Sequence, residues 1–253
     1  MKKALLRLAR MLGGAYLVPR INAGVRSISS FAHWMQFAIQ WGVQPNPEWY
    51  DHFLDQHWDW YKSRMPFSWE RGIFNLMAMR QGARVLEVCC GDGFNAHHFY
   101  SIRAGKILSV DFDPNAIDHA KRNFRAPNVE YRVADIRTDL PAGTYDNVIW
   151  DAAIEHFTET EIASLMADIK GRLAPDGVLS GYTIVEVGNE KSHHEHEYEF
   201  KSKEDLTRFL SPHFKNVKVI ETIYPIRHNL YFYAANGPLP LDEGWERQVV
   251  VRT

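Results

Sequence analysis

The sequence is poor in cysteine. Only Cys89 and Cys90 occur among 253 residues, and the two are adjacent. A bridge between neighbouring cysteines is strained and closes almost no loop, so a disulfide-rich secreted scaffold is excluded. Two free thiols are typical of a reducing compartment, and we therefore expect a cytoplasmic protein.

Long uncharged apolar runs are also missing. No segment approaches the roughly 20 apolar residues that a membrane-spanning helix needs. The opening stretch KKALLRLARMLGGAYLV resembles a secretion signal, but Arg7 and Arg10 interrupt its apolar part. We expect this segment to remain uncleaved.

Acidic residues are absent from the first 47 positions. Glu48 is the first acid, and six cationic residues precede it: Lys2, Lys3, Arg7, Arg10, Arg20 and Arg26. The whole chain carries −2, so the remaining residues offset these six positive charges with a net −8. An acidic main body argues against nucleic acid as a partner, because the phosphate backbone is bound by cations.

Residues 3–17 have the period of an amphipathic helix, which Pro19 is expected to end. Its apolar face consists of Leu5, Leu8, Leu12 and Tyr16. Two interpretations remain open for the basic segment 2–17. It lies on an anionic membrane face, peripherally on the inner side, or it packs against the main body or a second copy of the chain as a homodimer.

A different rhythm begins at residue 84, where short apolar runs alternate with amphipathic stretches. Strands are predicted at 84–88, 106–110, 129–133, 147–150, 177–184, 216–221 and 229–235. Helices are predicted at 71–79, 94–102, 114–124, 159–173 and 203–210, with a further helix start at 46–48. The alternation predicts an α/β fold with a Rossmann-like, doubly wound sheet of seven strands, mainly parallel. Because no helix separates the last two strands, the C-terminal strand is expected to be antiparallel.

Three regions follow from this pattern. Residues 1–69 form an N-terminal helical extension and lid, 70–236 form the sheet domain, and 237–253 form a C-terminal tail.

A glycine-containing turn follows the first predicted strand. Gly91, Gly93 and Ala96 match the G-x-G-x-x-G/A pattern of dinucleotide-binding turns, and Asp111 follows Gly91 by 20 residues. An acid at that place is typical of one that binds ribose hydroxyls. The order strand, turn, helix, strand, acid is more specific than the glycines alone.

The charge of the turn discriminates between ligands. Glu87 and Asp92 would repel a pyrophosphate, whereas they would attract an ammonium and a sulfonium. One such charge pair contributes roughly 4 kcal/mol at about 4 Å and an effective dielectric near 20, before desolvation is subtracted. S-adenosylmethionine is therefore favoured over NAD. An NAD(P)-dependent oxidoreductase and a non-catalytic S-adenosylmethionine-binding module are the alternatives.

The segment VLEVCCGDGF resembles the first motif of class I S-adenosylmethionine-dependent methyltransferases, and Cys89 stands where that family usually has its first glycine. SVDFDP, VADIR, YDNVIWDAAIEHF and LAPDGVL extend the resemblance in order, over roughly residues 70–235. The resemblance implies a methyl-transferring enzyme whose cofactor-binding residues are Glu87, Cys89, Gly91, Gly93, Asp111, Phe112, Asp135 and Ile136.

Methyl transfer from a sulfonium needs alignment, and it needs a base only if the acceptor loses a proton. The candidates follow the fourth predicted strand, where ligands of open α/β sheets bind. We assign catalysis to His156 and Asp151, with Glu155 between them. His156 has a suitable unperturbed pKa; as an alternative, it caps a helix or faces solvent.

No metal site is expected. His193, His194, Glu195, His196 and Glu197 are rich in ligand atoms but consecutive, so in an extended loop alternate side chains point apart. A loop that closes over the acceptor, with His194 or His196 in contact, is favoured over a metal site; a solvated loop is the third interpretation. Asp151 stands where catechol-type relatives keep a magnesium ligand, but Gly181-Tyr182-Thr183 offers no matching acids.

Aromatic residues crowd the stretch from Trp34 to Trp69, which the family resemblance implies is a lid over the acceptor. Most of these residues are expected to be packing residues. Two or three of Tyr50, Trp58, Tyr61 and Trp69 are expected to contact the acceptor or the sulfonium. The acceptor is expected to be a small molecule methylated on oxygen, such as a sugar, a lipid-linked intermediate or another metabolite.

Overall fold

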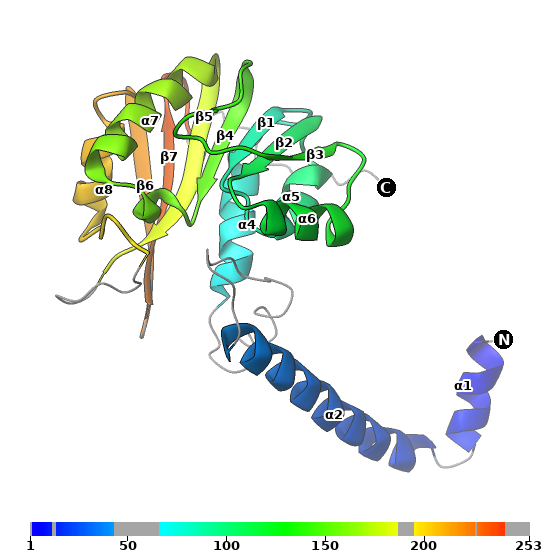
Figure 1. The fold of residues 1–253 in the computed structure, drawn as a ribbon. Helices are drawn as coiled ribbons and strands as arrows, with labels where there is room; N and C mark the ends of the chain where they lie inside the picture. Colours follow the sequence, from blue (N-terminus) through cyan, green and yellow to red (C-terminus); the bar gives the residue numbers. More distant parts are fainter. Residues whose placement is uncertain (1, 12–13, 43–65, 187–194, 226, 241–253) are drawn as a thin grey trace. The chain divides into compact units, whose positions relative to one another are not determined.

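The computed structural model describes residues 2–11, 14–42, 66–186, 195–225 and 227–240 (Figure 1). The chain divides into two units, Met1–Arg64 and Met65–Thr253. The expected boundary at residue 70 falls inside helix α4, Phe67–Met77. The helix start predicted at 46–48 lies outside the described residues.

The N-terminal unit contains two helices, α1 (Lys2–Met11) and α2 (Gly14–Gly42). The expectation that Pro19 ends the first helix is wrong, because Pro19 lies inside α2. It is the sixth residue of this helix, just beyond the first four, whose N–H groups have no intrahelical acceptor. Only the bond to the carbonyl of Ala15 is lost there, and the remaining residues continue the helix.

The second unit is built on one seven-stranded sheet (Figure 1). Its strands are β1 (Arg84–Val88), β2 (Lys106–Asp111), β3 (Val129–Val133), β4 (Tyr145–Asp151), β5 (Leu173–Ile184), β6 (Asn216–Tyr224) and β7 (Arg227–Ala235). Their order is β3-β2-β1-β4-β5-β7-β6, and β7 runs antiparallel to both neighbours. The predicted fold class is confirmed.

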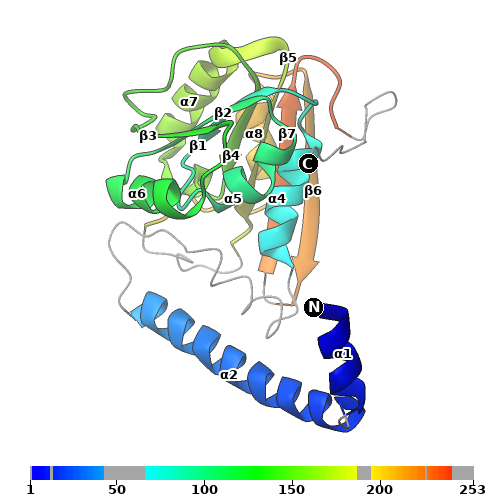
Figure 2. The ribbon, with the colours of Figure 1, turned by 90° about the vertical axis from the view of Figure 1, so that its right-hand side faces the viewer.

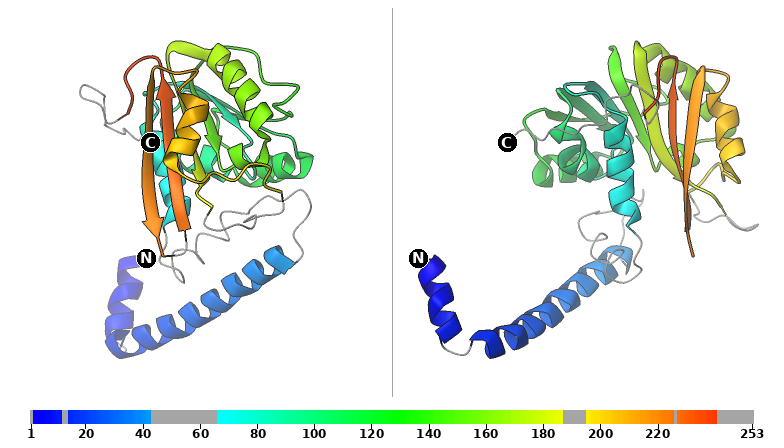
Figure 3. Two further views of the ribbon diagram at one scale, coloured as in Figure 1. Left: turned by 90° about the vertical axis from the view of Figure 1, so that its left-hand side faces the viewer. Right: turned by 180° about the vertical axis from the view of Figure 1, so that it is seen from behind.

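Helices cover both faces of the sheet (Figures 2 and 3). One face carries α4, α5 (Phe94–His98), the short helix η2 (Tyr100–Ile102) and α6 (Pro114–Asn123). The opposite face carries α7 (Glu159–Arg172) and α8 (Lys203–Leu210). Because both faces are covered, the last four residues of β1 are all buried, and three of these four are apolar.

Local signals explain where these helices begin. Asp113 caps α6 by accepting from the N–H of Asn115, and Pro114 occupies the first turn. Thr158 and Glu161 form a reciprocal capping box at the start of α7. Such caps satisfy N–H groups that the helix itself leaves without acceptors.

Strand β1 lies between β2 and β4. From β1 the strand order continues to β2 and β3 on one side and to β4 and β5 on the other, so the direction of the connections reverses at β1. In open α/β sheets a ligand binds at the carboxyl ends of the strands at such a reversal. The topology therefore predicts a ligand site beside the residues that follow β1, β2 and β4. None of the helices in the described ranges is long and apolar enough to cross a membrane.

Candidate cofactor and acceptor site

The turn after β1 uses left-handed backbone at three positions. Cys89, Gly91 and Gly93 have φ of 55°, 53° and 78°. A Cβ on Gly93 would lie 2.7 Å from a ring carbon of Tyr131, so only glycine fits there. A Cβ on Gly91 would meet nothing within 4 Å, which leaves open space over the turn.

Cys89 adopts this left-handed conformation without being glycine, at a cost of roughly 1–2 kcal/mol. The family's usual glycine thus corresponds to a real backbone requirement, which the cysteine meets under strain. Burial raises the pKa of both Cys89 and Cys90, and nearby carboxylates add to the effect. The two thiols therefore stay protonated and have little thiolate reactivity.

Glu87 lies buried beneath the turn with 2% of its surface exposed. Its Oε2 accepts a hydrogen bond from the hydroxyl of Ser109 at 2.6 Å. Burial raises the pKa of Glu87 to about 8; the Ser109 hydrogen bond opposes this rise, and Asp151, Asp92 and Asp111 add to it. The site thus holds a carboxyl group that a cationic ligand would ionise.

Asp111 ends β2 and is nearly buried. Its Oδ2 accepts from the N–H of Gly91 at 2.8 Å, and its Oδ1 accepts from the N–H of Asp113 at 3.0 Å. Burial raises its pKa, and these backbone hydrogen bonds partly counter the rise. Asp111 therefore ties the glycine turn to β2. The neighbouring Phe112 is 50% exposed, so its aromatic ring is accessible just after β2.

Asp135 and Ile136 follow β3. Asp135 makes a two-pronged ion pair with Arg137, with a closest separation of 2.8 Å, and this hydrogen bonding lowers the pKa of Asp135. Ile136 is buried in the main core, with 4% of its surface exposed. Of the two residues, Ile136 has the apolar environment expected near an adenine. Asp135 is instead paired with Arg137.

Asp151, at the end of β4, is fully engaged by three side chains. Arg71 donates to its Oδ2 from Nε at 2.9 Å and from Nη2 at 2.7 Å. Asn75 donates to Oδ1 and Asn95 donates to Oδ2, each at 3.1 Å. Among the described residues, Oδ1 of Asn95 has no hydrogen-bond partner although it is buried.

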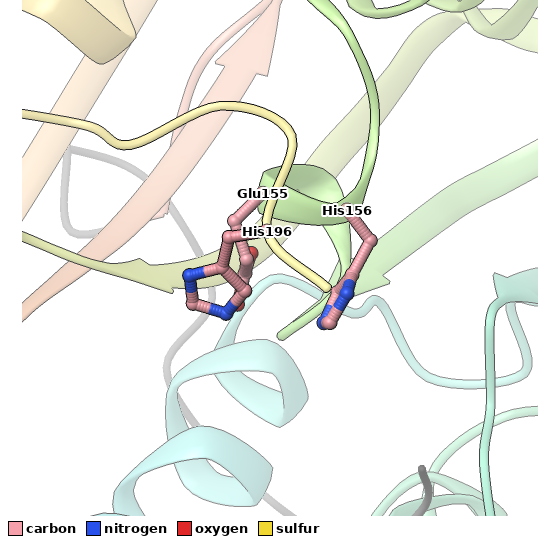
Figure 4. A group of neighbouring side chains, drawn as sticks. All are labelled: Glu155, His156 and His196. Carbon is pink, nitrogen blue, oxygen red and sulfur yellow. The ribbon is translucent and has the colours of Figure 1, made fainter. Parts of the chain in front are cut away.

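Glu155, His156 and His196 come together beyond β4 (Figure 4). Glu155 and His156 lie on the short helix η3 (Ile154–His156), and His196 arrives on the segment that precedes α8. One ligand atom from each of the three lies within 4.8 Å of the others. The two imidazole rings are perpendicular, with centroids 5.0 Å apart.

The predicted residues of the glycine turn and those that follow β2, β3 and β4 thus all lie at the carboxyl ends of the parallel strands. His193, His194, Tyr50, Trp58 and Tyr61 lie outside the described residues. Trp69 is described: its ring meets Phe99 edge-on, with centroids 6.0 Å apart, and 44% of its surface is exposed.

Sequence reasoning missed Arg71, Asn75 and Asn95, the partners of Asp151, and Thr183, whose hydroxyl donates to Oε2 of Glu155 at 3.0 Å. The spacing of Arg71 and Asn75 by four residues is the one available signal, because it puts both on one face of a helix. The 80 residues between Arg71 and Asp151 hide the pairing itself.

These features fit S-adenosylmethionine. The space over Gly91 admits a ligand, and the unpartnered Oδ1 of Asn95 offers an acceptor for an ammonium group. Glu87 would ionise beside such a group, and Asp111 and Phe112 stand at the end of β2, on the side of the turn.

Comparisons with known proteins agree. Residues 85–177 match the family model described as a methyltransferase domain. An uncharacterized methyltransferase of Mycobacterium tuberculosis is 32% identical over 102 residues, which are 40% of this chain and 50% of that protein. A ribosomal protein L11 methyltransferase of Ralstonia pickettii is 34% identical over 100 residues, 39% of this chain and 33% of that protein. The chain thus spans half or less of the length of these curated relatives.

Solved structures share the fold. The N-methyltransferase NodS from Bradyrhizobium japonicum has a TM-score of 0.56 at 17% identity, covering 68% of this chain and 98% of NodS. The DhpI–SAH complex has a TM-score of 0.51 at 23% identity, covering 61% of this chain and 77% of DhpI.

Residues 85–177 thus match a methyltransferase domain, and the sheet around them has the fold of solved methyltransferases. The resemblance predicted from the sequence motifs is confirmed. The DhpI and NodS structures include complexes with S-adenosylhomocysteine, the product form of S-adenosylmethionine, which supports S-adenosylmethionine as the cofactor.

Proposed function

We propose that the protein transfers the methyl group of S-adenosylmethionine to an oxygen of a small-molecule acceptor. The observation that best supports this proposal is the acid-lined turn between β1 and α5, which lies within the segment that matches a methyltransferase domain. Its charge suits a ligand that is positive at sulfur and nitrogen. The same charge disfavours the pyrophosphate of a nicotinamide cofactor.

The proposed cofactor contacts follow the strand ends. Glu87, Cys89, Gly91 and Gly93 surround the methionine part, with Glu87 attracting the ammonium. Asp111 and Phe112 hold the ribose and the adenine. Asp135 and Ile136 close the adenine pocket from β3.

Methyl transfer is an in-line displacement with an activated leaving group, so the protein mainly aligns the reactants and excludes water. The acceptor proton then needs a destination. His156 is the proposed proton acceptor: it is half-buried, and its Nδ1 donates to the carbonyl of Glu195 at 3.3 Å. This hydrogen bond leaves Nε2 as the basic nitrogen of the neutral ring.

Asp151 has a different role from the proton transfer expected of it. Each of its oxygens already accepts at least one hydrogen bond, and a buried ion pair joins it to Arg71 with a separation of 2.7 Å. We assign it to positioning: it fixes α4 and α5 against the end of β4.

The acceptor is proposed to be a sugar, a lipid-linked intermediate or another metabolite rather than nucleic acid, because residues 48–253 carry net negative charge. A screen of hydroxyl-bearing acceptors with methyl-labelled cofactor identifies it. Calorimetry tests the cofactor first: heat with S-adenosylmethionine and none with NAD is expected. Tight binding of NAD alone would point to the oxidoreductase alternative. Cofactor binding without product from any acceptor would point to a binding module.

The N-terminal helices are proposed to contact an anionic lipid surface. Along α2 an apolar stripe recurs at intervals of three, four or seven residues, with every member at least 42% exposed: Leu17, Ile21, Val25, Ile28, Met35 and Ile39. The six cations and the lack of acids before Glu48 complement anionic headgroups. The cytoplasmic location expected from the two thiols stays a prediction.

Co-sedimentation with phosphatidylglycerol vesicles tests this contact, with phosphatidylcholine vesicles as the neutral comparison. Ile21→Glu with Ile28→Glu should abolish sedimentation. Ala23→Glu with Ser27→Glu adds the same charge to the other face of α2 and should weaken binding less. A dimer in solution that the first pair disrupts, with no vesicle binding, would instead assign the stripe to a second copy of the chain.

A further inference from the structure

We propose that Glu155, His156 and His196 bind a divalent transition metal ion of the zinc type, which holds the acceptor oxygen beside the cofactor. This inference rests on the proposed function, and it gives the acceptor its chemistry: a hydroxyl group that the ion makes acidic. It also refines the role of His156, which becomes a ligand rather than a free base.

The ligand set matches the chemistry of such an ion. Two imidazoles and one carboxylate suit zinc and its first-row neighbours, while magnesium prefers oxygen ligands only. The three ligand atoms lie within 4.8 Å of one another. Around an ion at about 2.1 Å from each ligand, tetrahedral edges are roughly 3.4 Å, so side-chain rotations that close the gap by about 1.4 Å complete the site.

Each proposed ligand is oriented by a second group, as ligands in metal sites are. The Nδ1 of His196 lies 3.2 Å from Oε1 of Glu199, and the Nδ1 of His156 lies 3.3 Å from the carbonyl oxygen of Glu195. Carboxylate and carbonyl oxygens only accept, so each Nδ1 carries the hydrogen and each neutral ring presents Nε2 to an ion. The Thr183 hydroxyl donates to Oε2 of Glu155 and so orients this carboxylate.

Backbone bonds fix the segment that brings His196. The N–H groups of Glu197 and Tyr198 both donate to the carbonyl of Glu155, at 2.9 and 3.0 Å. His196 and Glu155 are each only 6% exposed. Burying a carboxylate next to two imidazoles is costly in isolation, and a divalent cation offsets that cost.

The cluster follows β4, and the cofactor turn follows the adjacent strand β1. Glu155 is close enough to Cys89 that its charge helps raise the pKa of that thiol. Because β1 and β4 are adjacent parallel strands, an ion at Glu155, His156 and His196 would lie beside the proposed methyl donor.

The ion acts as a Lewis acid on the acceptor oxygen. The acceptor hydroxyl coordinates through oxygen and loses its proton to solvent. The oxygen lone pair forms the O–CH₃ bond while the C–S bond breaks. Both electrons of that bond stay on sulfur, and the products are the methyl ether, S-adenosylhomocysteine and one proton.

The test uses the full chain after chelator treatment, titrated with Co²⁺ as a coloured probe for zinc. We expect one Co²⁺ per chain with visible d–d absorption, displaced by Zn²⁺ and not by Mg²⁺. His196→Ala and Glu155→Ala should weaken Co²⁺ binding by more than about 100-fold, and Glu199→Gln by about 10-fold. His213→Ala is the matched control, because this histidine lies near Lys170 on α7 and should leave the titration unchanged.

S-adenosylmethionine affinity, measured on each of these proteins, separates the two proposals and reports folding. Substoichiometric Co²⁺ binding by the original chain, or equal binding by His196→Ala, overturns the metal site even where the cofactor binds. Stoichiometric Co²⁺ with no cofactor binding overturns the methyl-transfer function and leaves the metal site standing.

Discussion

The protonation of Glu87 gives the sharpest test of how this site recognises its cofactor. In the ligand-free protein, burial raises the pKa of Glu87 to about 8, so most molecules carry a neutral Glu87 at pH 7. An ammonium group bound beside it restores the charged form. Cofactor binding should therefore release a proton, and binding should tighten as the pH rises toward 8.

The magnitude follows from linkage. We assume that only the ionised form binds well and that the pKa is about 8. The dissociation constant is then about 100-fold higher at pH 6, and about twofold higher at pH 8, than its limit at high pH. The charge pair contributes roughly 4 kcal/mol, which corresponds to almost 1000-fold in affinity. Glu87→Gln, a permanent neutral mimic, should therefore bind several hundredfold more weakly than the original chain at pH 8, and only about tenfold more weakly at pH 6.

The same carboxyl group sets a stability trend of known sign. Its folded-state pKa lies above the ordinary 4.5, so ionisation opposes folding. The free energy of unfolding should fall as the pH rises from about 4.5 to about 8, by up to about 5 kcal/mol without cofactor. Glu87→Gln keeps an acceptor for Ser109, so it should stabilise the protein at pH 8 while weakening cofactor binding.

Calorimetry in two buffers of different ionisation enthalpy measures both effects. Near pH 7 the original chain should release close to one proton per cofactor bound, and Glu87→Gln should release almost none. Glu130→Gln is the matched control, because that acid is exposed on β3. Affinity that does not vary between pH 6 and pH 8, without proton release, would refute this account of the acid-lined turn.

Three further predictions follow from single contacts. Asp111→Ala removes the acceptor that ties down Gly91 and the proposed ribose contact, so cofactor affinity should fall at least tenfold by calorimetry; unchanged affinity removes the ribose assignment. Cys89→Gly relieves a left-handed residue and should stabilise by about 0.5–1 kcal/mol, seen as a melting temperature raised by a few degrees, whereas a lowered one argues against strain at that position. Asp151→Ala strands the buried Arg71 and should cost about 3–5 kcal/mol in denaturant unfolding; a loss under 1 kcal/mol would contradict the positioning role.

Much of the fold was readable from local pattern. All seven strands were predicted in place, because period-2 and continuous apolar runs directly reflect burial on the faces of a sheet. Strand β5 extends further than predicted, from Leu173, since Leu173 pairs with Tyr145 of β4 before a register shift that spans Pro175 and Asp176. At Pro19 a local rule failed: the residue is a helix breaker in mid-helix but is tolerated close to the start of α2.

The cofactor turn was predictable for the same reason. Its glycines, acids and flanking strand are consecutive, so their geometry depends on few residues. The raised pKa of Glu87 was not predictable, because it depends on burial among Ser109, Asp92, Asp111 and Asp151.

The order of elements and the chemistry of the glycine turn were thus determined by sequence alone, since both arise from residues that are neighbours along the chain. Tertiary structure decided which distant side chains meet. Arg71 reaches Asp151 across 80 residues, and His196 arrives beside His156 although the consecutive histidines gave no metal-like spacing. The physical reason is that the connections between strands bring the carboxyl ends of β4 and β5 and the segment before α8 together at one end of the sheet. No local periodicity in the sequence encodes this placement.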